Sequence, residues 1–179
     1  ITSSEQLEAQ GIPLLATLPR SVWLWKKTHL RRKTLFASRW KHRTSNVPFL
    51  PVDRPADMFV EAVRGLRTSL HFAMMEARNN VLMITGPSPE IGKSFISTNL
   101  AAIFAQGDKK VLLIDADIRR GYLHKYFDQD LQPGLSEYLN GQNTLEQITR
   151  STSVSNLDFM SRGKSPANPA ELLSSEKFK

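Results

Sequence analysis

Residues 81–122 read VLMITGPSPEIGKSFISTNLAAIFAQGDKKVLLIDADIRRGY, and this stretch decides the fold. An apolar run at residues 80–85 leads into an irregular loop at 86–92, a helical pattern from 93 to 106 and a second apolar run at 110–115. Continuous apolar runs are typical of parallel strands that are covered on both faces. The order strand, loop, helix, strand implies a right-handed crossover. We therefore predict an α/β fold built on a doubly wound parallel sheet.

The loop between the first strand and the helix is similar to a phosphate-binding loop. Residues 87–94 read PSPEIGKS, against the pattern G-x-x-x-x-G-K-[ST]. In such a loop, backbone N–H groups surround an anion at a helix N-terminus, the lysine reaches the β- and γ-phosphates, and the hydroxyl enters the Mg²⁺ shell. Pro87 stands where the pattern has its first glycine, and Gly86 comes one residue too early. The strand before the loop and the helix after it favour a phosphate site over an ordinary turn with Lys93 in solvent.

We therefore predict a P-loop NTPase-type sheet that binds ATP with Mg²⁺. The residues assigned to the nucleotide share the loop and the first helical turn; they are Ser88, Pro89, Glu90, Ile91, Gly92, Lys93, Ser94 and Phe95.

Two aspartates follow the second apolar run. Asp115 and Asp117 come at the carboxyl end of a strand beside the loop, where open α/β sheets bind ligands. Being two apart in an extended segment, both are expected to face the same side. One carboxylate can enter the metal shell and the other can accept a proton from an attacking hydroxyl. The alternative is that both are helix caps or surface charges.

Elsewhere the pattern predicts a long helix from residue 56 or 57 to about 76, with an apolar stripe at helical spacing. Residues 134–141 and 144–151 are interpreted as short helices and residues 156–163 as a third strand. A last helix is expected from Asn168, as a cap, with Pro169 at its first position.

The net charge of +7 is concentrated in residues 25–43, WKKTHLRRKTLFASRWKHR, where cations alternate with aromatic rings. This composition suits an anionic membrane surface, where each nearby cation adds about 1 kcal/mol. Nucleic acid binding and a solvated basic linker are the alternatives. We favour the membrane surface and expect no nucleic acid partner. No apolar run approaches the roughly 18 residues of a membrane span. No signal peptide is visible, and without cysteine there is neither a disulfide nor a thiolate metal site.

These motifs together resemble the bacterial tyrosine kinases of the exopolysaccharide co-polymerase family. PSPEIGKS and LLIDADIR are similar to that family's Walker A and Walker A′ motifs, and the family tolerates a non-glycine at the Pro87 position. EAVRGLR, residues 61–67, matches the family's E-x-x-R-x-x-R motif. SRGKSPANPAELL, residues 161–173, resembles its R-G-x-x-P-x-N-P-x-E-L-L stretch. The lead-in at residues 3–19 is similar to the segment after the second transmembrane helix of fused members.

The resemblance implies roles for the candidate residues. Lys93 contacts the phosphates, and Ser94 binds Mg²⁺. Asp115 acts as the base toward a substrate tyrosine, and Asp117 lies in the outer shell of the metal, although the assignment between the two aspartates stays open. It further implies that Tyr122 is autophosphorylated and then engaged by Arg162.

The resemblance also implies partners and a location. Glu61, Arg64 and Arg67 contact a neighbouring protomer in a homo-oligomeric ring, unless they only form a salt-bridged surface helix. The parent protein is anchored in the inner membrane by its transmembrane helices and basic arm, and its kinase domain faces the cytoplasm. It regulates exopolysaccharide or capsule polymerisation and export. A cognate tyrosine phosphatase removes the phosphate from its tyrosines.

Two family parts are not found in the sequence: a later Walker B strand with its aspartate, and a tyrosine-rich tail. The chain also begins with Ile, so we interpret it as a piece of a longer kinase, incomplete in its sheet and weak or inactive alone. We expect residues 1–55 to form a juxtamembrane lead-in and basic linker, and residues 56–179 to form the kinase domain. The rivals are a MinD/ParA-like ATPase, which would carry a second lysine at the place of Ser88, and a non-catalytic membrane-proximal adaptor.

Overall fold

The structure is a computed structural model that describes residues 8–24 and 49–178. The basic stretch at residues 25–43, predicted to meet the membrane, lies outside the described residues. Within them, the chain forms two units: one comprises residues 8–24 and Leu50–Thr85, and the other comprises Phe49 and residues 86–178. The predicted domain boundary after residue 55 stays a prediction.

The first unit is built around the long helix α4, Met58–Met75, preceded by the single turn α3, Leu50–Asp53. Helix α4 begins where the sequence predicts, because the Asp57 carboxylate accepts a hydrogen bond from the Phe59 N–H at 2.9 Å. The hydroxyl of Ser21 donates to the other Asp57 oxygen at 2.7 Å and so ties the N-terminal segment to the cap. The buried side chains of α4 follow the helical period; they are Phe59, Val60, Val63 and Leu70.

The strand predicted at residues 80–85 does not form. These residues have extended or bent backbone without ladder hydrogen bonds, and the side chains of Val81 and Met83 are 78% and 81% exposed. An apolar run becomes a strand only when another strand satisfies its N–H and C=O groups. In the described part of the chain, the sheet contains no strand that pairs with this run.

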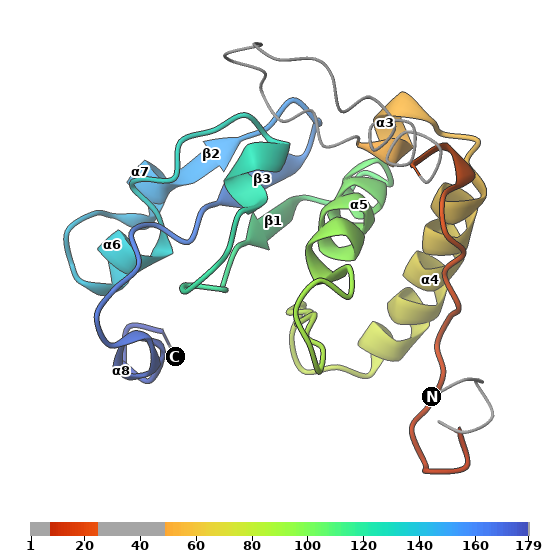
Figure 1. Cartoon of the computed structure of the whole chain (residues 1–179), viewed down its shortest axis with the longest axis horizontal. Helices are drawn as coiled ribbons and strands as arrows, with labels where there is room; N and C mark the ends of the chain where they lie inside the picture. Colours follow the sequence, from red (N-terminus) through yellow and green to blue (C-terminus); the bar gives the residue numbers. More distant parts are fainter. Residues whose placement is uncertain (1–7, 25–48, 179) are drawn as a thin grey trace, which may run out of the picture. The chain divides into compact units, whose positions relative to one another are not determined.

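The second unit contains a three-stranded sheet in the order β1-β3-β2, seen as arrows in Figure 1. Its strands are β1, Val111–Ile114, β2, Thr149–Ser151, and β3, Leu157–Met160. Strand β1 pairs in parallel with β3, Val111 opposite Leu157, as a parallel sheet requires. The predicted crossover from residues 80–85 to β1 is not formed among the described residues, because the first of its two strands is missing. Strand β2 is antiparallel to β3, so the sheet is mixed rather than wholly parallel. The reason is the short connection at residues 152–156, which is too short for the crossover that a parallel return needs.

Helix α5, Lys93–Ala105, packs on the sheet and starts at the predicted residue. Ala101 and Ala105 contact Leu157, and small side chains here let the helix approach β3 closely. The expectation that both faces of β1 are covered is wrong for the described residues. Leu112 and Ile114 are 45% and 43% exposed, because alternate side chains of a strand point to opposite faces and only one face of β1 is packed.

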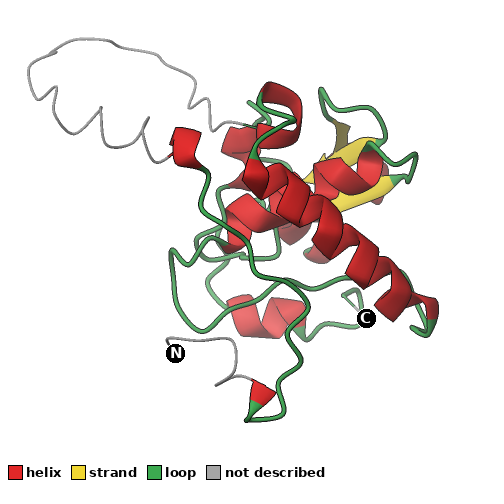
Figure 2. Cartoon of the chain, turned by 90° about the vertical axis from the view of Figure 1, so that its right-hand side faces the viewer, coloured by secondary structure: helices red, strands yellow, loops and turns green. Residues whose placement is uncertain are grey.

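Short helices complete the second unit. They are the 3₁₀ helix η1, Leu123–Tyr126, and the helices α6, Leu135–Leu139, α7, Leu145–Ile148, and α8, Pro169–Leu173. A second apolar cluster joins them to the strand end, with Ile118, Leu135, Leu139, Ile148 and Met160 buried. Figure 2 shows how much of the described chain is helix and loop around the small sheet.

Two sequence expectations for these helices need correction. The second predicted short helix ends at Ile148, and residues 149–151 continue as β2. Helix α8 begins at Pro169 as expected, but Asn168 donates from its Nδ2 to Glu171 at 3.0 Å instead of accepting from the backbone. Within residues 8–24 and 49–178, every helix is too short or too polar to cross a membrane.

Replacing the cap of α4 tests the first unit. We expect Asp57→Ala to lower the free energy of unfolding by about 1 kcal/mol, since the Phe59 N–H and the Ser21 hydroxyl both lose their acceptor. Urea unfolding measures the change. The control is Asp57→Asn, whose side-chain oxygen can still accept from Phe59 and should recover most of the loss. Equal stability of all three proteins would show that this cap contributes nothing.

Candidate nucleotide site

Two residues with left-handed backbone conformation lead the loop at residues 86–92 into helix α5. Glu90 has φ 62°, and Gly92, the N-cap of α5, has φ 101° and ψ 8°. The first α-helical bond runs from Ile96 N to the Gly92 carbonyl at 2.9 Å. The N–H groups before it have no acceptor inside the helix and carry the positive end of the helix dipole. The loop therefore ends in the kind of helix terminus that binds phosphate.

Gly86 explains the displaced glycine of the motif. A Cβ on this residue would lie 2.2 Å from Ile91 Cδ1 and 3.4 Å from Lys93 Cδ. The Ile91 side chain thus lies directly over residue 86, and a larger residue at this position would require that exposed side chain to move aside. Pro87, at the position of the motif's glycine, lies one residue past this closest approach.

The ammonium group of Lys93 is held by the loop. Its Nζ donates to the Ser88 carbonyl at 2.8 Å, so it bends back over the turn instead of extending into solvent as an ordinary helix-start lysine would. Ser94 follows it in the first turn, and its carbonyl accepts from the Thr98 hydroxyl at 2.7 Å. An anion at the helix terminus would meet both the backbone N–H groups and this cation.

Asp115 has a buried carboxylate that binds the chain downstream of it. Its side chain is 4% exposed, and its Oδ2 accepts from the Leu123 N–H at 3.0 Å. Burial raises the pKa of Asp115 to about 6. The hydrogen bonds from the backbone of Leu123 and Asp117 oppose that rise, as does the charge of Arg162, while the charge of Asp117 adds to it. Close to neutral pH this group can therefore both hold and release a proton.

Asp117 has a different environment. It is exposed, and its Oδ1 accepts from the Arg120 N–H at 2.9 Å across a tight turn. Strand β1 ends at Ile114, before either aspartate, so strand alternation does not fix the two side chains as the sequence argument assumed. One carboxylate is enclosed by protein and the other faces solvent.

Gly121 lies directly against the Asp115 carboxylate and was not among the predicted site residues. A Cβ at residue 121 would lie 2.3 Å from Asp115 Oδ1 and 2.5 Å from its Oδ2. The Gly121 N–H donates to the Asp117 carbonyl at 2.7 Å, which closes the turn over the carboxylate. The only sequence signal was the glycine between the two arginines and Tyr122.

Arg162 holds the same turn from the other side. Its Nε donates to the Gly121 carbonyl at 2.7 Å, and its Nη1 donates to the Ile118 carbonyl at 3.3 Å. Ser165, also missed from sequence, accepts from the same Nη1 at 3.0 Å and donates to the Ile118 carbonyl at 3.2 Å. The structure thus brings Asp115 and Arg162 together around one turn, and Arg162 binds the carbonyl of the residue before Tyr122.

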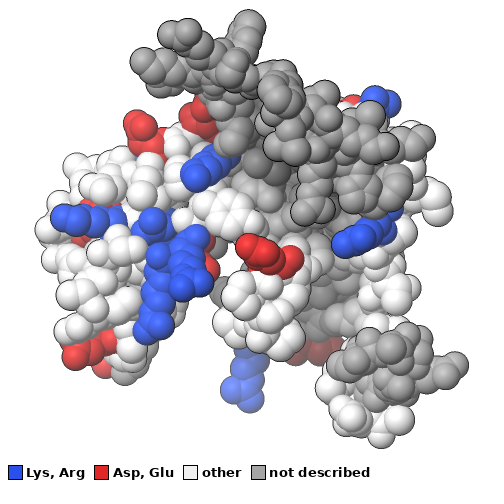
Figure 3. Space-filling view, viewed as in Figure 1, with Lys and Arg blue, Asp and Glu red and all other residues white. Residues whose placement is uncertain are grey.

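The described residues offer few side chains that could bind Mg²⁺. No three His, Cys, Asp or Glu side chains among them are grouped closely enough to form a metal cage. The expected ligands are the Ser94 hydroxyl and the Asp117 carboxylate. This small hard-donor set fits Mg²⁺, which keeps several waters and takes phosphate oxygens for the rest of its octahedron. In Figure 3, Lys and Arg side chains gather to the left of the middle of the displayed face.

Comparisons with known proteins agree with this geometry. A family model for the CobQ/CobB/MinD/ParA nucleotide binding domain matches residues 82–157. The tyrosine-protein kinase etk of Escherichia coli K12 is 53% identical over 100% of this chain and 25% of its own length. The solved kinase domain of Escherichia coli ETK matches with a TM-score of 0.83 and 53% identity, over 97% of this chain and 64% of that one. The solved BceF tyrosine kinase domain matches with a TM-score of 0.84 and 43% identity, over 99% and 68%.

This chain belongs to the bacterial tyrosine kinase family. It spans about a quarter of the length of the curated relative etk. The family fold is confirmed, with its P-loop, its central sheet and its helices, although in the described residues the sheet is mixed and incomplete.

The E-x-x-R-x-x-R motif of the kinase family lies on α4, in the first unit. Glu61 and Arg64 form an ion pair one turn apart, and Arg64 also donates to the Pro55 carbonyl at 3.1 Å. Both side chains are partly exposed. The observed pair fits the alternative of a salt-bridged helix surface, and a ring contact by Glu61, Arg64 and Arg67 stays a prediction.

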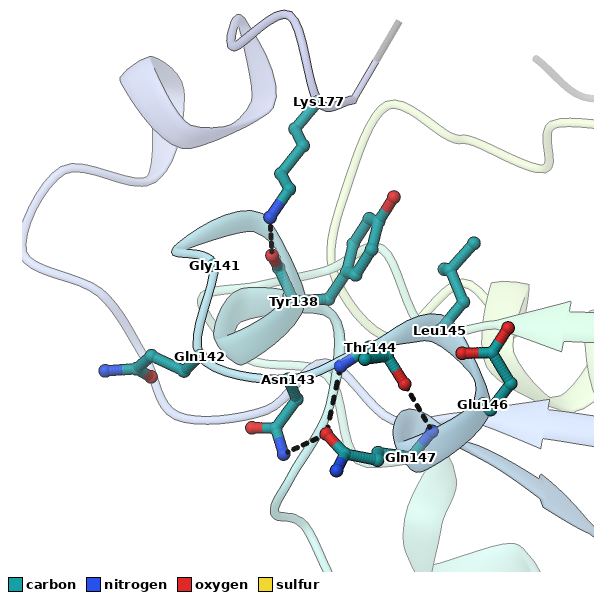
Figure 4. Close-up of a pocket in the computed structure, with 9 residues that line it drawn as sticks. All are labelled: Tyr138, Gly141, Gln142, Asn143, Thr144, Leu145, Glu146, Gln147 and Lys177. Atoms are coloured by element: carbon teal, nitrogen blue, oxygen red, sulfur yellow. Dashed lines mark hydrogen bonds between the residues drawn. The ribbon is translucent and has the colours of Figure 1, made fainter.

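A separate hollow lies between α6, α7 and the C-terminal residues, and none of the predicted site residues lines it. Figure 4 shows its polar groups paired with one another: Asn143 Nδ2 and the Thr144 N–H both donate to Gln147 Oε1 at 3.0 Å, and Lys177 Nζ donates to the Tyr138 carbonyl at 3.1 Å. The hollow is therefore separate from the loop at residues 86–92.

The buried carboxylate predicts a pH dependence of stability. The folded pKa of Asp115 is about 6, above its ordinary 3.8, so its stabilising contribution is present below pH 4 and is lost as the pH rises through 6. We expect wild type, measured against Asp115→Asn in EDTA, to lose about 2 kcal/mol of unfolding free energy between pH 4 and pH 7. Urea unfolding of both proteins at several pH values gives the difference, in which other titrating groups cancel. A difference that does not change with pH contradicts the burial argument.

The close approach of Gly121 to Asp115 makes a second prediction. Gly121→Ala should lower the unfolding free energy by about 1–3 kcal/mol, because the new methyl group displaces the carboxylate. Hydrogen exchange of the Leu123 amide should accelerate as its acceptor moves away. Gly65→Ala, in open space on α4, is the control and should be neutral or slightly stabilising. Unchanged exchange at Leu123 in the Gly121 variant counts against this account.

Proposed function

We propose that this chain is the ATP-binding part of a protein-tyrosine autokinase that regulates exopolysaccharide or capsule polymerisation and export. The observation that carries the proposal is the loop at residues 86–92, which ends at the N-terminus of α5 with the Lys93 ammonium bent over it. Membership of the bacterial tyrosine kinase family supports the same reaction.

The proposed roles follow from the chemistry of each group. Lys93 and the first N–H groups of α5 neutralise the phosphates, while Ser94 and the exposed Asp117 hold Mg²⁺. Asp115 accepts the proton of the attacking tyrosine hydroxyl, which its pKa of about 6 suits near neutral pH. When bound, Mg²⁺ would offset the charge that develops on the transferred phosphoryl group.

Tyr122 and Arg162 are the proposed regulatory pair. The Tyr122 side chain is 46% exposed, and Arg162 already binds the carbonyl of the preceding residue. A phosphate on Tyr122 would compete for the guanidinium donors that now bind main-chain carbonyls, since charge-assisted bidentate bonds are stronger than neutral ones. Phosphorylation would thereby loosen the turn over Asp115.

The proposed partners belong to the longer protein. Further copies of the kinase would assemble through Glu61, Arg64 and Arg67 into a ring in which each protomer phosphorylates a neighbour. The inner membrane would hold the protein through its transmembrane helices and the basic arm at residues 25–43, with the kinase domain, residues 56–179, on the cytoplasmic face. A tyrosine phosphatase would reset it. We propose no nucleic acid partner.

Two other functions remain as rivals. The matched family model also covers MinD and ParA, but the serine at position 88 stands where a MinD/ParA-like ATPase would carry its second lysine. A non-catalytic adaptor would bind nucleotide, or a partner alone, without phosphoryl transfer.

Substitution of the P-loop lysine tests the proposal. In the full-length protein incubated with ATP and Mg²⁺, Lys93→Met should reduce phosphotyrosine about 100-fold or more, because the phosphates lose a preorganised cation. The control is Lys109→Met, which removes an exposed lysine of the same unit outside the site and should leave the signal unchanged. An anti-phosphotyrosine blot measures both. ATP hydrolysis without phosphotyrosine would favour the MinD/ParA-like rival, and neither activity would favour the adaptor.

A further inference from the structure

Tyr122 and Tyr126 contact each other across the 3₁₀ helix η1. Tyr122 is the residue just before η1 and Tyr126 is its last residue, and the two rings lie against each other. The ring centroids are 6.2 Å apart and the ring planes differ by 26°, a stacked pair. Offset stacks at this separation are favourable beyond the area that they bury.

The two phenol groups also reach one another. Burial raises the pKa of Tyr126 well above its ordinary range, and the charge of Tyr122 and a side-chain hydrogen bond with Tyr122 add to the rise. Tyr126 is the partly buried member of the pair, while Tyr122 remains 46% exposed. The contact therefore joins the exposed ring of Tyr122 to the partly buried ring of Tyr126.

The 3₁₀ helix that carries Tyr126 is anchored at both ends by contacts that do not involve Tyr122. Residue 127 packs its ring on Phe159 of β3, with centroids 4.8 Å apart, and so anchors the end of η1 to the sheet. The start of η1 is anchored by the bond from the Leu123 N–H to Asp115. Tyr126 is thus carried by a segment that is anchored at both ends, and its ring is the one on which the Tyr122 ring stacks.

We propose that Tyr126 is a positioning residue that holds unphosphorylated Tyr122, and that Tyr122 must leave Tyr126 before it accepts a phosphoryl group. This deepens the proposed autokinase function and rests on it for its biological role. In the transfer, the Tyr122 phenol oxygen bonds to the γ-phosphorus of ATP, the bond from that phosphorus to the bridging oxygen of ADP breaks, and the phenol proton passes to a base. The reacting oxygen is the atom that lies against Tyr126, so the stack and the attack compete.

Two substitutions separate the ring from the hydroxyl. Tyr126→Phe keeps the stack and removes the hydrogen bond, whereas Tyr126→Leu removes both. The chain has only three tyrosines, and the third, Tyr138, lies in α6 with its ring against Lys177, which makes it an internal control. Thermal unfolding of each variant checks that the fold survives, and the ordering of the two variants distinguishes positioning from a general loss of structure.

The first measurement needs no ATP. Iodination of Tyr122 in the full-length protein, followed by peptide mass spectrometry, should be slowest in wild type, intermediate in Tyr126→Phe and fastest in Tyr126→Leu. The whole range should be about two- to tenfold. Iodination of Tyr138 should stay constant. Equal rates at Tyr122 in wild type and Tyr126→Leu would overturn the proposal.

The second measurement follows phosphorylation of Tyr122 in a Lys93→Met background, using an added soluble tyrosine kinase with ATP and Mg²⁺. The initial rates should follow the same order, because release of Tyr122 is required whichever enzyme supplies the phosphoryl group. Rates that do not differ overturn the proposal even if iodination does differ. Failure of the autokinase function would show instead as no phosphotyrosine in the protein with Lys93 intact, so the two failures are distinguishable.

Discussion

The enclosed carboxylate of Asp115 is the constraint around which the second unit is arranged. A charged group that is 4% exposed is unfavourable unless it is protonated or given donors, and here the Leu123 N–H supplies one. That bond fixes the start of η1, and the turn at Gly121 covers the same oxygens. The tension between burial and hydrogen bonding is what places the pKa of Asp115 near neutrality. The feature that is unfavourable for folding is thus the one that suits proton transfer.

The phosphate loop depends on strained backbone conformation rather than on a buried charge. Two residues with positive φ, Glu90 and Gly92, lead the loop into the first turn of α5, and the glycine at residue 86 leaves room for the Ile91 side chain. A left-handed conformation is unfavourable for a residue with a side chain, so Glu90 is held there by the surrounding loop. The loop and the buried carboxylate both belong to the second unit, and one is shaped by backbone conformation and the other by the burial of a charge.

The sequence predicted the features that depend on local pattern. Helix α4 and helix α5 from Lys93 follow from helical periodicity, and the parallel arrangement of β1 follows from its continuous apolar run. The pattern failed where distant partners decide. Residues 80–85 are apolar enough for a strand, yet strand formation needs a neighbour that the described chain lacks. Gly121, Ser165 and Tyr126 were missed because their roles arise from steric contact, a main-chain bond and a ring stack that the fold alone brings together.

Arg162 grips the turn at residues 118–121 by its carbonyl oxygens, not by its side chains. Every amino acid has the same main-chain carbonyl, so these hydrogen bonds do not depend on which side chains stand at the exposed positions Arg119 and Arg120. Those two positions can therefore diversify among members of the family without releasing the architecture beneath them. The main chain of the turn stays fixed by Arg162, while its exposed side chains can change. Such changes could alter what the surface of the turn contacts without moving Asp115 beneath it.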